Sequence, residues 1–519
     1  MRIYNIAFTM RMGYLTNSDS IDEFLAAIGE TKVEQSYIRE LLLEIIRCVS
    51  SGLTVVCEPN YVDRVYRDTY YTYFATKYDA PSRNCKRLFL FVGEFLPKDI
   101  FDYADDNRQR LQECFIGVSV LKPIVQGKIG KTLLDAYKMH IPGYVRTTIF
   151  RFFFLGHELQ VDGFPYSAQD GEMMTCAETS TWNVIEYFGT RYPEHRAILP
   201  SEMLHAREAL SSERSLPSEG LSVFAISYLF KTFGFAPRIC VNKNVGADKA
   251  EVQEDERFHR TFHYYIESGF PLAVAVTIPG MNGHAIVCMG HGAEQAMGSG
   301  LSRSFLDLSD YPCVNSADLY KQYVLMDDNQ PPYRLEEFGG FARYFSDKAQ
   351  VQSFVVPLPR HVFLKAIDAE VVAKKMLANQ ELGLPRWGKE AKINVSEKNP
   401  LVFRLFLTSA RKFRCVRVRN ENTDPMVQGF YGGYPLPKFI WVAEFAAWNI
   451  YQEGCVNGEI VIDATATVGK NVAGSVIFIR YGRKWLFHTQ NDKLQWEHIQ
   501  TEADAVSYPM YKNNLSISN

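Results

Sequence analysis

The middle of the chain alternates between two hydrophobic patterns, which predict helices and strands in turn. Apolar residues recur with the spacing of one helix face in residues 176–188, and Gly189 follows as a helix stop. The same pattern, again followed by glycine, predicts helices at residues 221–233 and 258–268. Continuous or alternating apolar runs predict strands at residues 236–241, 270–278, 284–289, 323–326, 353–357 and 362–364. A helix followed by several strands predicts an α+β domain.

Both flanks of this region also mix the two patterns. The N-terminal part shows helical spacing at residues 21–51 and strand patterns at residues 53–57, 88–92 and 115–123. The C-terminal part predicts helices at residues 401–413 and 439–451, strands at residues 415–419 and 459–463, and a hairpin of residues 475–480 and 484–488. The predicted organisation is an N-terminal α+β subdomain (1–160), a central domain (161–365), a helical connector (366–399) and a C-terminal α+β module (400–519).

Composition supports a folded protein and narrows its partners. The chain has 519 residues, of which 47% are hydrophobic and 22% charged, as is ordinary for folded domains. Its net charge of -3 gives no general attraction to nucleic acid or to an anionic membrane. The densest apolar run, residues 149–155, contains Arg151 and is too short to span a bilayer. The N-terminus does not have the pattern of a signal peptide, so we expect a cytoplasmic protein without a membrane segment.

Cys176 is the candidate nucleophile. The chain has ten cysteines without a Cys-x-x-Cys pair, which favours reduced thiols, most of them small core residues. Cys176 differs because it stands where the polar turn 169–175 gives way to the predicted helix 176–188. The positive end of a helix dipole favours thiolate over thiol, and thiolate is the nucleophilic form.

Three further residues suit the roles that a thiol nucleophile requires. His284 opens a predicted strand after a glycine turn and could act as the base, while Asp327 ends another strand and could orient the His284 ring. Asp328 is the alternative acid, since it follows Asp327 directly. The side-chain amide of Gln169, seven residues before Cys176, could hold the oxygen that becomes negative when the thiolate attacks a carbonyl.

The order of these motifs resembles that of the papain-like cysteine peptidases, most closely the bacterial double-glycine (bacteriocin-processing) branch. The resemblance covers about residues 160–365. Its motifs are Gln169, the Cys176-Ala-x-x-Ser helix, the Gly220-Leu221 helix, the Gly269-Phe-Pro-Leu-Ala-Val strand, Gly283-His284-Ala-Ile-Val-Cys-Met-Gly290 and Tyr-Val-Leu-Met-Asp327. The resemblance implies a nucleophile helix packed on an antiparallel sheet that carries His284 and Asp327, with Gln169 completing an oxyanion hole.

The chain departs from that family pattern in three places. Ala177 follows Cys176 where the family usually has glycine, and the acid is doubled as Asp327-Asp328 where the family tends to have Asp-Pro. A long polar loop, residues 293–318, separates the histidine strand from the aspartate strand, and we expect it to cover the cleft as a lid or specificity element.

The function implied by the resemblance is that of an intracellular cysteine peptidase or isopeptidase. Cys176 would attack an amide, His284 would act as base and then acid, and Gln169 with the Cys176 N–H would stabilise the oxyanion. No metal or organic cofactor is expected, and the added modules favour a protein or peptide substrate. Two alternatives stay open: an acyltransferase, transglutaminase or glutamine deamidase using the same thioester, and a non-catalytic interaction protein on the same scaffold.

Other polar residues admit functional and structural interpretations. His259 and His263 share a helix face at a spacing that could hold zinc, but the Glu of a His-Glu-x-x-His motif is missing, so surface positions are expected. His291 is also expected at the surface. Glu444 and Asp463 could form a C-terminal site, although a packing helix and an edge strand explain them equally well.

Overall fold

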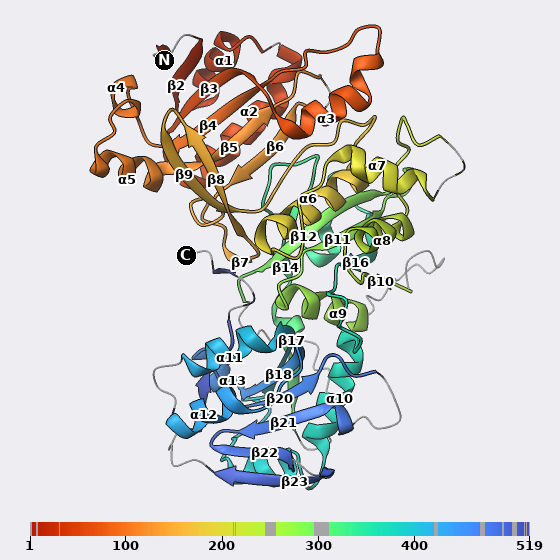
Figure 1. The fold of residues 1–519 in the computed structure, drawn as a ribbon. Coiled ribbons are helices and arrows are strands. Elements are labelled where there is room, and N and C mark those ends of the chain that lie inside the picture. Colours follow the sequence, from red (N-terminus) through yellow and green to blue (C-terminus); the bar gives the residue numbers. More distant parts are fainter. Residues whose placement is uncertain are drawn as a thin grey trace.

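The computed structural model shows an α+β protein whose three main sheets follow one another along the molecule (Figure 1). The structure describes residues 3–6, 9–30, 32–125, 127–210, 212, 214–243, 256–294, 311–419, 424–467, 473–489, 492–500, 506–512, 514 and 516–517.

The N-terminal sheet is antiparallel and keeps its strands in chain order. Its strands are β1 (Ile3–Ile6), β2 (Met10–Leu15), β3 (Leu53–Tyr61), β4 (Cys85–Val92), β5 (Phe115–Leu121) and β6 (Ile129–Leu134). Helices α1 (Ser18–Ala27) and α2 (Lys32–Val49) cover one face, and the hairpin β8 (Thr148–Phe154) and β9 (His157–Gly163) covers the other. The strand period explains this: Leu88 and Leu90 face the two helices, whereas Phe89 and Phe91 face the hairpin.

Three shorter helices complete this part of the chain, and one prediction for it needs correction. The helices are α3 (Arg64–Thr72), α4 (Pro97–Ile100) and α5 (Asp105–Cys114). The helical pattern at residues 21–51 is two helices and not one, because Gly29 takes a positive φ of 78° and ends the first.

The central sheet has helices on both faces. Its strands run in the order β10 (Arg238–Val241), β16 (Gln350–Val356), β11 (Leu272–Thr277), β12 (His284–Gly292), β14 (Gln322–Met326) and β15 (Arg334–Glu337). One face packs against α6 (Cys176–Arg191) and α8 (Val223–Thr232), beside which lies α7 (Pro200–Glu208). The other face packs against α9 (Glu256–Glu267). Along β11, Ala273 faces α6 while Leu272 and Val274 face α9.

The C-terminal sheet lies at the far end of the molecule (Figure 1). Its order is β13 (Cys313–Asn315), β17 (Leu401–Ser409), β18 (Phe439–Ala447), β20 (Gly458–Asp463), β21 (Val476–Tyr481), β22 (Lys484–Thr489) and β23 (Asp492–Gln500). Helix α10 (Ala366–Ala378) packs on one face, and α11 (Ala410–Val418) and α12 (Pro425–Gly433) pack on the other. Further elements are α13 (Trp448–Gln452), β19 (Cys455–Val456) with β24 (Tyr508–Pro509), and short helical turns at Phe74–Thr76, Ser316–Leu319, Phe338–Gly340, Leu384–Gly388 and Ala473–Ser475.

Several predicted elements of the C-terminal region are wrong. Residues 401–409 and 439–447 are strands where helices were predicted, and residues 410–418 form a helix that covers all but the last residue of the predicted strand 415–419. Both strands are buried on both faces, so their apolar runs lack the alternation that marks a half-buried strand. Residues 362–364 are not a strand either, since Phe363 and Leu364 both donate backbone hydrogen bonds to Ala464 before α10 begins.

Two strands cross the expected domain boundaries. β13, from the central segment, pairs in parallel with β17 of the C-terminal sheet. β25 (Ser516–Ile517), near the C-terminus, pairs with β7 (Gly143–Val145), which pairs in turn with β12 of the central sheet. The expected lid at residues 293–318 therefore contains a strand of the C-terminal sheet, and its residues 295–310 lie outside the described residues.

A buried network of ion pairs joins the central and C-terminal sheets. Arg404 of β17 pairs with Glu267 at the end of α9 and, at 2.6 Å, with Glu444 of β18. Arg417 of α11 lies 2.6 Å from the same Glu444 carboxylate. His291, near the end of β12, lies 3.0 Å from Glu267. Because unpaired buried charges are costly, these partners hold the two sheets in one arrangement.

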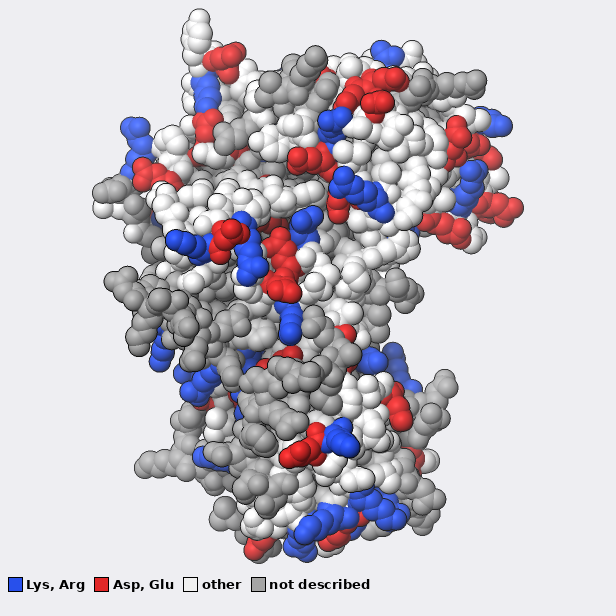
Figure 2. Space-filling view, turned by 180° about the vertical axis from the view of Figure 1, so that it is seen from behind, with Lys and Arg blue, Asp and Glu red and all other residues white. Residues whose placement is uncertain are grey.

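Charged side chains of both signs lie on the face of the molecule shown in Figure 2. On the face shown in Figure 2, basic and acidic side chains are interspersed among the described residues, and neither sign forms a continuous patch. In the described part of the chain, no helix combines the length and apolar character needed to cross a membrane.

Candidate active site

Cys176 is the first residue of α6, and the helix behind it is buried along most of its length. Thr175 is the N-cap residue with an extended backbone, and its carbonyl accepts the Thr179 N–H at 2.9 Å. The Ser180 hydroxyl donates to the carbonyl of Ala285 at 3.0 Å, which fixes α6 against β12. Cys176 itself is half-buried, so its sulfur is held at a defined point without being sealed in the core.

The loop before Cys176 is shaped by Asp170. One oxygen of its carboxylate accepts the backbone N–H groups of Glu172, Met173 and Met174 at 2.8–3.0 Å. Gly171 has a positive φ of 73°, a conformation that glycine adopts without strain. The turn is therefore fixed, and with it the entry of the chain into α6.

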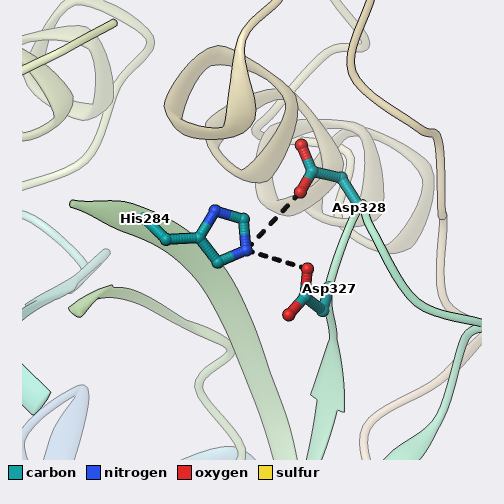
Figure 3. A group of neighbouring side chains, drawn as sticks. All are labelled: His284, Asp327 and Asp328. Carbon is teal, nitrogen blue, oxygen red and sulfur yellow. Dashed lines mark hydrogen bonds and ion pairs between the residues drawn. The ribbon is translucent and has the colours of Figure 1, made fainter. Parts of the chain in front are cut away.

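His284 and Asp327 meet at the ends of neighbouring strands. In the pairing of β12 with β14, Val287 lies opposite Met326, which brings the next residue, Asp327, to the His284 end of β12. His284 Nε2 donates to Asp327 Oδ1 at 2.8 Å, and both side chains are buried. Both dashed lines in Figure 3 end on Nε2, so Nδ1 lies on the other side of the ring.

The Cys176 thiol lies close enough to His284 to affect the pKa of its ring. Burial acts to lower the pKa of His284, but its hydrogen bond with Asp327 and its interaction with Cys176, together with the charges of Asp327 and Asp328, raise that pKa well above its ordinary value. The imidazolium form is therefore favoured beside the sulfur, as a thiolate–imidazolium pair requires.

Tyr344 and Phe345 complete the surroundings of His284, and the sequence interpretation missed both. The Tyr344 hydroxyl donates to Asp327 Oδ2 at 2.7 Å and lies 3.4 Å from His284 Nε2. The Phe345 ring stands edge-on to the His284 ring, with centroids 5.3 Å apart. Burial, followed by the neighbouring Asp327 charge, raises the pKa of Tyr344, so the hydroxyl remains a donor. No motif marks these residues, because a turn after β15 brings them to the site.

Asp328 is close to His284 but is not its partner. Its Oδ1 lies 3.7 Å from His284 Nε2, beyond the 2.8 Å of Asp327, and accepts Asn329 Nδ2 at 3.2 Å. Its Oδ2 is buried without a hydrogen-bond partner. Burial raises the pKa of Asp328, the His284 charge opposes that shift and the Asp327 charge adds to it. The geometry thus favours Asp327 as the acid that orients His284.

Gln169 lies on the Asp328 side of this group. Its Nε2 donates to Asn329 Oδ1 at 3.2 Å. Its backbone is pressed against Gly127, where an added Cβ would come within 1.8 Å of the Gln169 carbonyl oxygen. Gly127 also has a positive φ of 67°, so this close approach needs glycine. The structure therefore brings Cys176, His284 and Asp327 together, and attaches Gln169 to the same loop through Asn329.

A small cavity of about 80 Å³ lies beside Gln169 and Asp328. Tyr37, Glu40 and Leu41 of α2 also line it. The N-terminal module therefore contributes to the surface next to the candidate site.

The same side chains have the spacing of a metal site. In the described part of the chain, one ligand atom each from His284, Asp327 and Asp328 lies within 4.8 Å of the others. The hydrogen bond between His284 and Asp327 already uses one atom of each residue, so an ion would have to displace it.

The other histidines do not lie where the sequence interpretation expected. His263 and His291 are buried between α9 and the central sheet, and the expectation of surface positions is wrong for both. His263 stacks on Tyr320 with ring centroids 5.1 Å apart, while His259, which is half-buried, lies 2.8 Å from the Tyr323 hydroxyl. His259 and His263 lie on α9 itself, and His291 lies on β12, with its ring centroid 5.5 Å from that of His263.

Comparisons with protein-family models, with curated protein sequences and with solved structures return no match. No family is therefore assigned to the chain, and functional interpretation depends on the geometry of the site.

Proposed function

We propose that the protein is a papain-like thiol hydrolase, a cysteine peptidase or isopeptidase whose nucleophile is Cys176. The observation that carries the proposal is a single histidine, His284, which is hydrogen-bonded to Asp327 and whose pKa is raised by both Asp327 and Cys176. A cysteine thiol is activated when a histidine base lies beside it and an acid orients the histidine ring. The nucleophile helix packed on an antiparallel sheet adds support to the papain-like interpretation.

The mechanism follows from the contacts. The Cys176 thiolate forms a bond to the amide carbonyl carbon, and the oxygen that becomes negative accepts the Cys176 N–H and a Gln169 amide N–H. His284 gives its proton to the amide nitrogen as the C–N bond breaks and the amine leaves. His284 then takes a proton from water, the resulting hydroxide attacks the thioester, and the S–C bond breaks to release the acid and restore Cys176.

The proposed substrate is a protein or peptide, because modules flank the site on both sides and α2 forms part of its wall. Acyl transfer and glutamine deamidation use the same thioester and differ only in the group that reacts with it. We place the protein in the cytoplasm, a location supported by its ten free cysteines.

Selective labelling of the thiol tests this proposal. Limiting iodoacetamide followed by peptide mass mapping should modify Cys176 at least about tenfold faster than Cys48 or Cys114, whose pKa values burial raises. His284→Ala should remove the advantage, and EDTA should not, since no step uses a metal. Equal labelling of these cysteines in the native protein would contradict the proposal.

A chromogenic ester tests turnover independently of the natural substrate. With p-nitrophenyl acetate, the protein should release a burst of nitrophenolate and carry an acetyl group on Cys176, detected as a mass increase in the Cys176 peptide. Cys176→Ala should abolish both signals. Adding glycylglycine separates hydrolysis from acyl transfer, because an acyltransferase would form acetylglycylglycine in preference to acetate.

A further inference from the structure

The residues after the aspartate strand form a continuous chain of hydrogen bonds to Gln169. Asp328 Oδ1 accepts Asn329 Nδ2 at 3.2 Å, and Asn329 Oδ1 accepts Gln169 Nε2 at 3.2 Å. The Asn329 backbone N–H donates to Asp327 Oδ1 at 3.0 Å. The turn that contains Asn329 therefore contacts both Asp327, which orients His284, and the side-chain amide of Gln169, the proposed oxyanion donor.

The chemistry of these groups fixes the direction of each bond. Asp328 Oδ1 accepts a hydrogen bond from the Asn329 NH₂ group, which can only donate. Asn329 must then present its oxygen to Gln169, and Gln169 must present its own NH₂ group in return. One Gln169 N–H is used by Asn329, and the second remains for another acceptor.

We propose that Asp328 and Asn329 are positioning residues that orient the Gln169 amide with its NH₂ group toward the oxyanion. This inference depends on the proposed thiol hydrolase function. It gives the doubled acid two separate tasks, since Asp327 orients the base and Asp328 orients, through Asn329, the oxyanion donor.

The surroundings of the two residues support this role. Asp328 is only 6% exposed, and its Oδ1 is occupied by Asn329, so water does not compete freely for that oxygen. The turn is held in addition by the Gln330 N–H, which donates to the Asp327 carbonyl at 3.1 Å. The chain therefore holds Asn329 in place by backbone as well as side-chain contacts.

Two reagents with different chemistry distinguish a loss of Gln169 positioning from a general loss of Cys176 reactivity. Acylation by p-nitrophenyl acetate creates an oxyanion, whereas alkylation by iodoacetamide displaces iodide at a tetrahedral carbon and creates none. Gln169→Ala should slow acylation about 100-fold, and Asn329→Ala about tenfold, with alkylation unchanged in both. Asn329→Ala added to Gln169→Ala should cause no further loss, because the two residues act in one chain.

Asn379→Ala is the matched control for the loss of an asparagine side chain. Asn379→Ala removes hydrogen bonds to the N–H groups of Glu381 and Leu382, far along the chain from the site, and should leave both rates unchanged. Asp328→Asn should slow acylation less than Asn329→Ala, because the amide that it introduces still offers an oxygen to Asn329 but no longer fixes the direction of the bond.

The outcomes separate the inference from the proposed function. If Asn329→Ala acylates as fast as the native protein, or loses acylation and alkylation equally, the positioning role is wrong and the thiol hydrolase proposal stands. If the native protein shows neither selective alkylation of Cys176 nor an acylation burst, the proposed function itself fails. Thermal unfolding of each variant, measured in parallel, identifies any that are not folded, and Asn329→Ser then replaces Asn329→Ala.

Discussion

Ser180 of α6 donates a hydrogen bond of 3.0 Å to the carbonyl oxygen of Ala285, the residue that follows His284 in β12. Ser180 lies four residues after Cys176, and therefore on the same face of the helix one turn further along. The bond consequently sets how far Cys176 stands from His284 across the helix–sheet interface.

Replacing Ser180 by alanine should slow the reaction of Cys176 with iodoacetamide several-fold, because the helix loses its polar anchor to β12. The buried Ala285 carbonyl would also lose its side-chain donor, at a cost of about 1 kcal/mol in the free energy of unfolding. Thr181→Ala is the control, since the Thr181 hydroxyl donates only to Ala177 within the helix. That variant should lose stability and keep its labelling rate; equal slowing in both would show that Ser180 does not set the alignment.

Asp327→Asn should lower the pKa of His284. The hydrogen bond and charge of Asp327 help to raise this pKa well above its ordinary value, and the amide keeps only part of the interaction. NMR titration of ¹³C-labelled histidine measures the shift directly, with the His284 signal assigned by its absence from His284→Ala. A His284 pKa that does not change in Asp327→Asn would contradict the pairing.

The same pKa predicts how stability depends on pH. A histidine whose pKa is raised by folding binds its proton more tightly in the folded state, so its contribution is fully present below its unfolded pKa of about 6.5. The contribution is lost as pH rises through the higher folded value. Thermal unfolding of the native protein should therefore show this loss at a higher pH than unfolding of Asp327→Asn. The same pH dependence of thermal unfolding in the native protein and in Asp327→Asn would contradict this prediction.

Tyr344→Phe should shift the His284 pKa in the opposite direction. The variant keeps the ring but removes the hydroxyl that donates to Asp327 Oδ2 at 2.7 Å. With one donor fewer, the carboxylate attracts the His284 proton more strongly, so the pKa of His284 should rise. The same NMR titration checks the sign, and a fall in the His284 pKa would show that the hydroxyl does not act through Asp327.

Arg404→Met should destabilise the protein by about 3 kcal/mol or more, because it leaves Glu267 and Glu444 buried with a lost partner. Denaturant unfolding measures the change. The double variant Arg404→Met/Glu267→Gln should lose less free energy of unfolding than the two single variants together, since the residues share one network. In the folded variants, Cys176 labelling should stay at the native rate, because the network contacts the far end of β12 from His284. Additive losses would argue against a coupled network.

The central region was predictable from sequence because its patterns agree with one another. Helix starts and short apolar strands at residues 176–289 gave elements close to those of α6, α8, β11 and β12, although α6 continues past the predicted stop at Gly189 to Arg191. The C-terminal sheet was not predictable from sequence. Its strands β17 and β18 are covered by helices on both faces, so their apolar runs fit a buried helix as well as a strand.

The candidate site was predictable only where its residues mark the ends of elements. Cys176 begins a helix, His284 begins a strand and Asp327 follows one, so each carries a signal in the local pattern. Tyr344 and Asn329 carry none, because their roles depend on which loops meet in space. For Asp328, the sequence left two acids open, and only the distances to His284 distinguish them.

The strand β25 has a consequence for the order in which the protein is made. β7 and β12 lie in the first three-fifths of the chain, whereas their outer neighbour β25 is formed by residues 516–517, and Arg146 beside β7 binds the carbonyl of Asn514. A ribosome must therefore synthesise the whole C-terminal module before this edge of the central sheet is covered. Until then the nascent chain presents an open strand edge, the kind of surface that chaperones shield from aggregation.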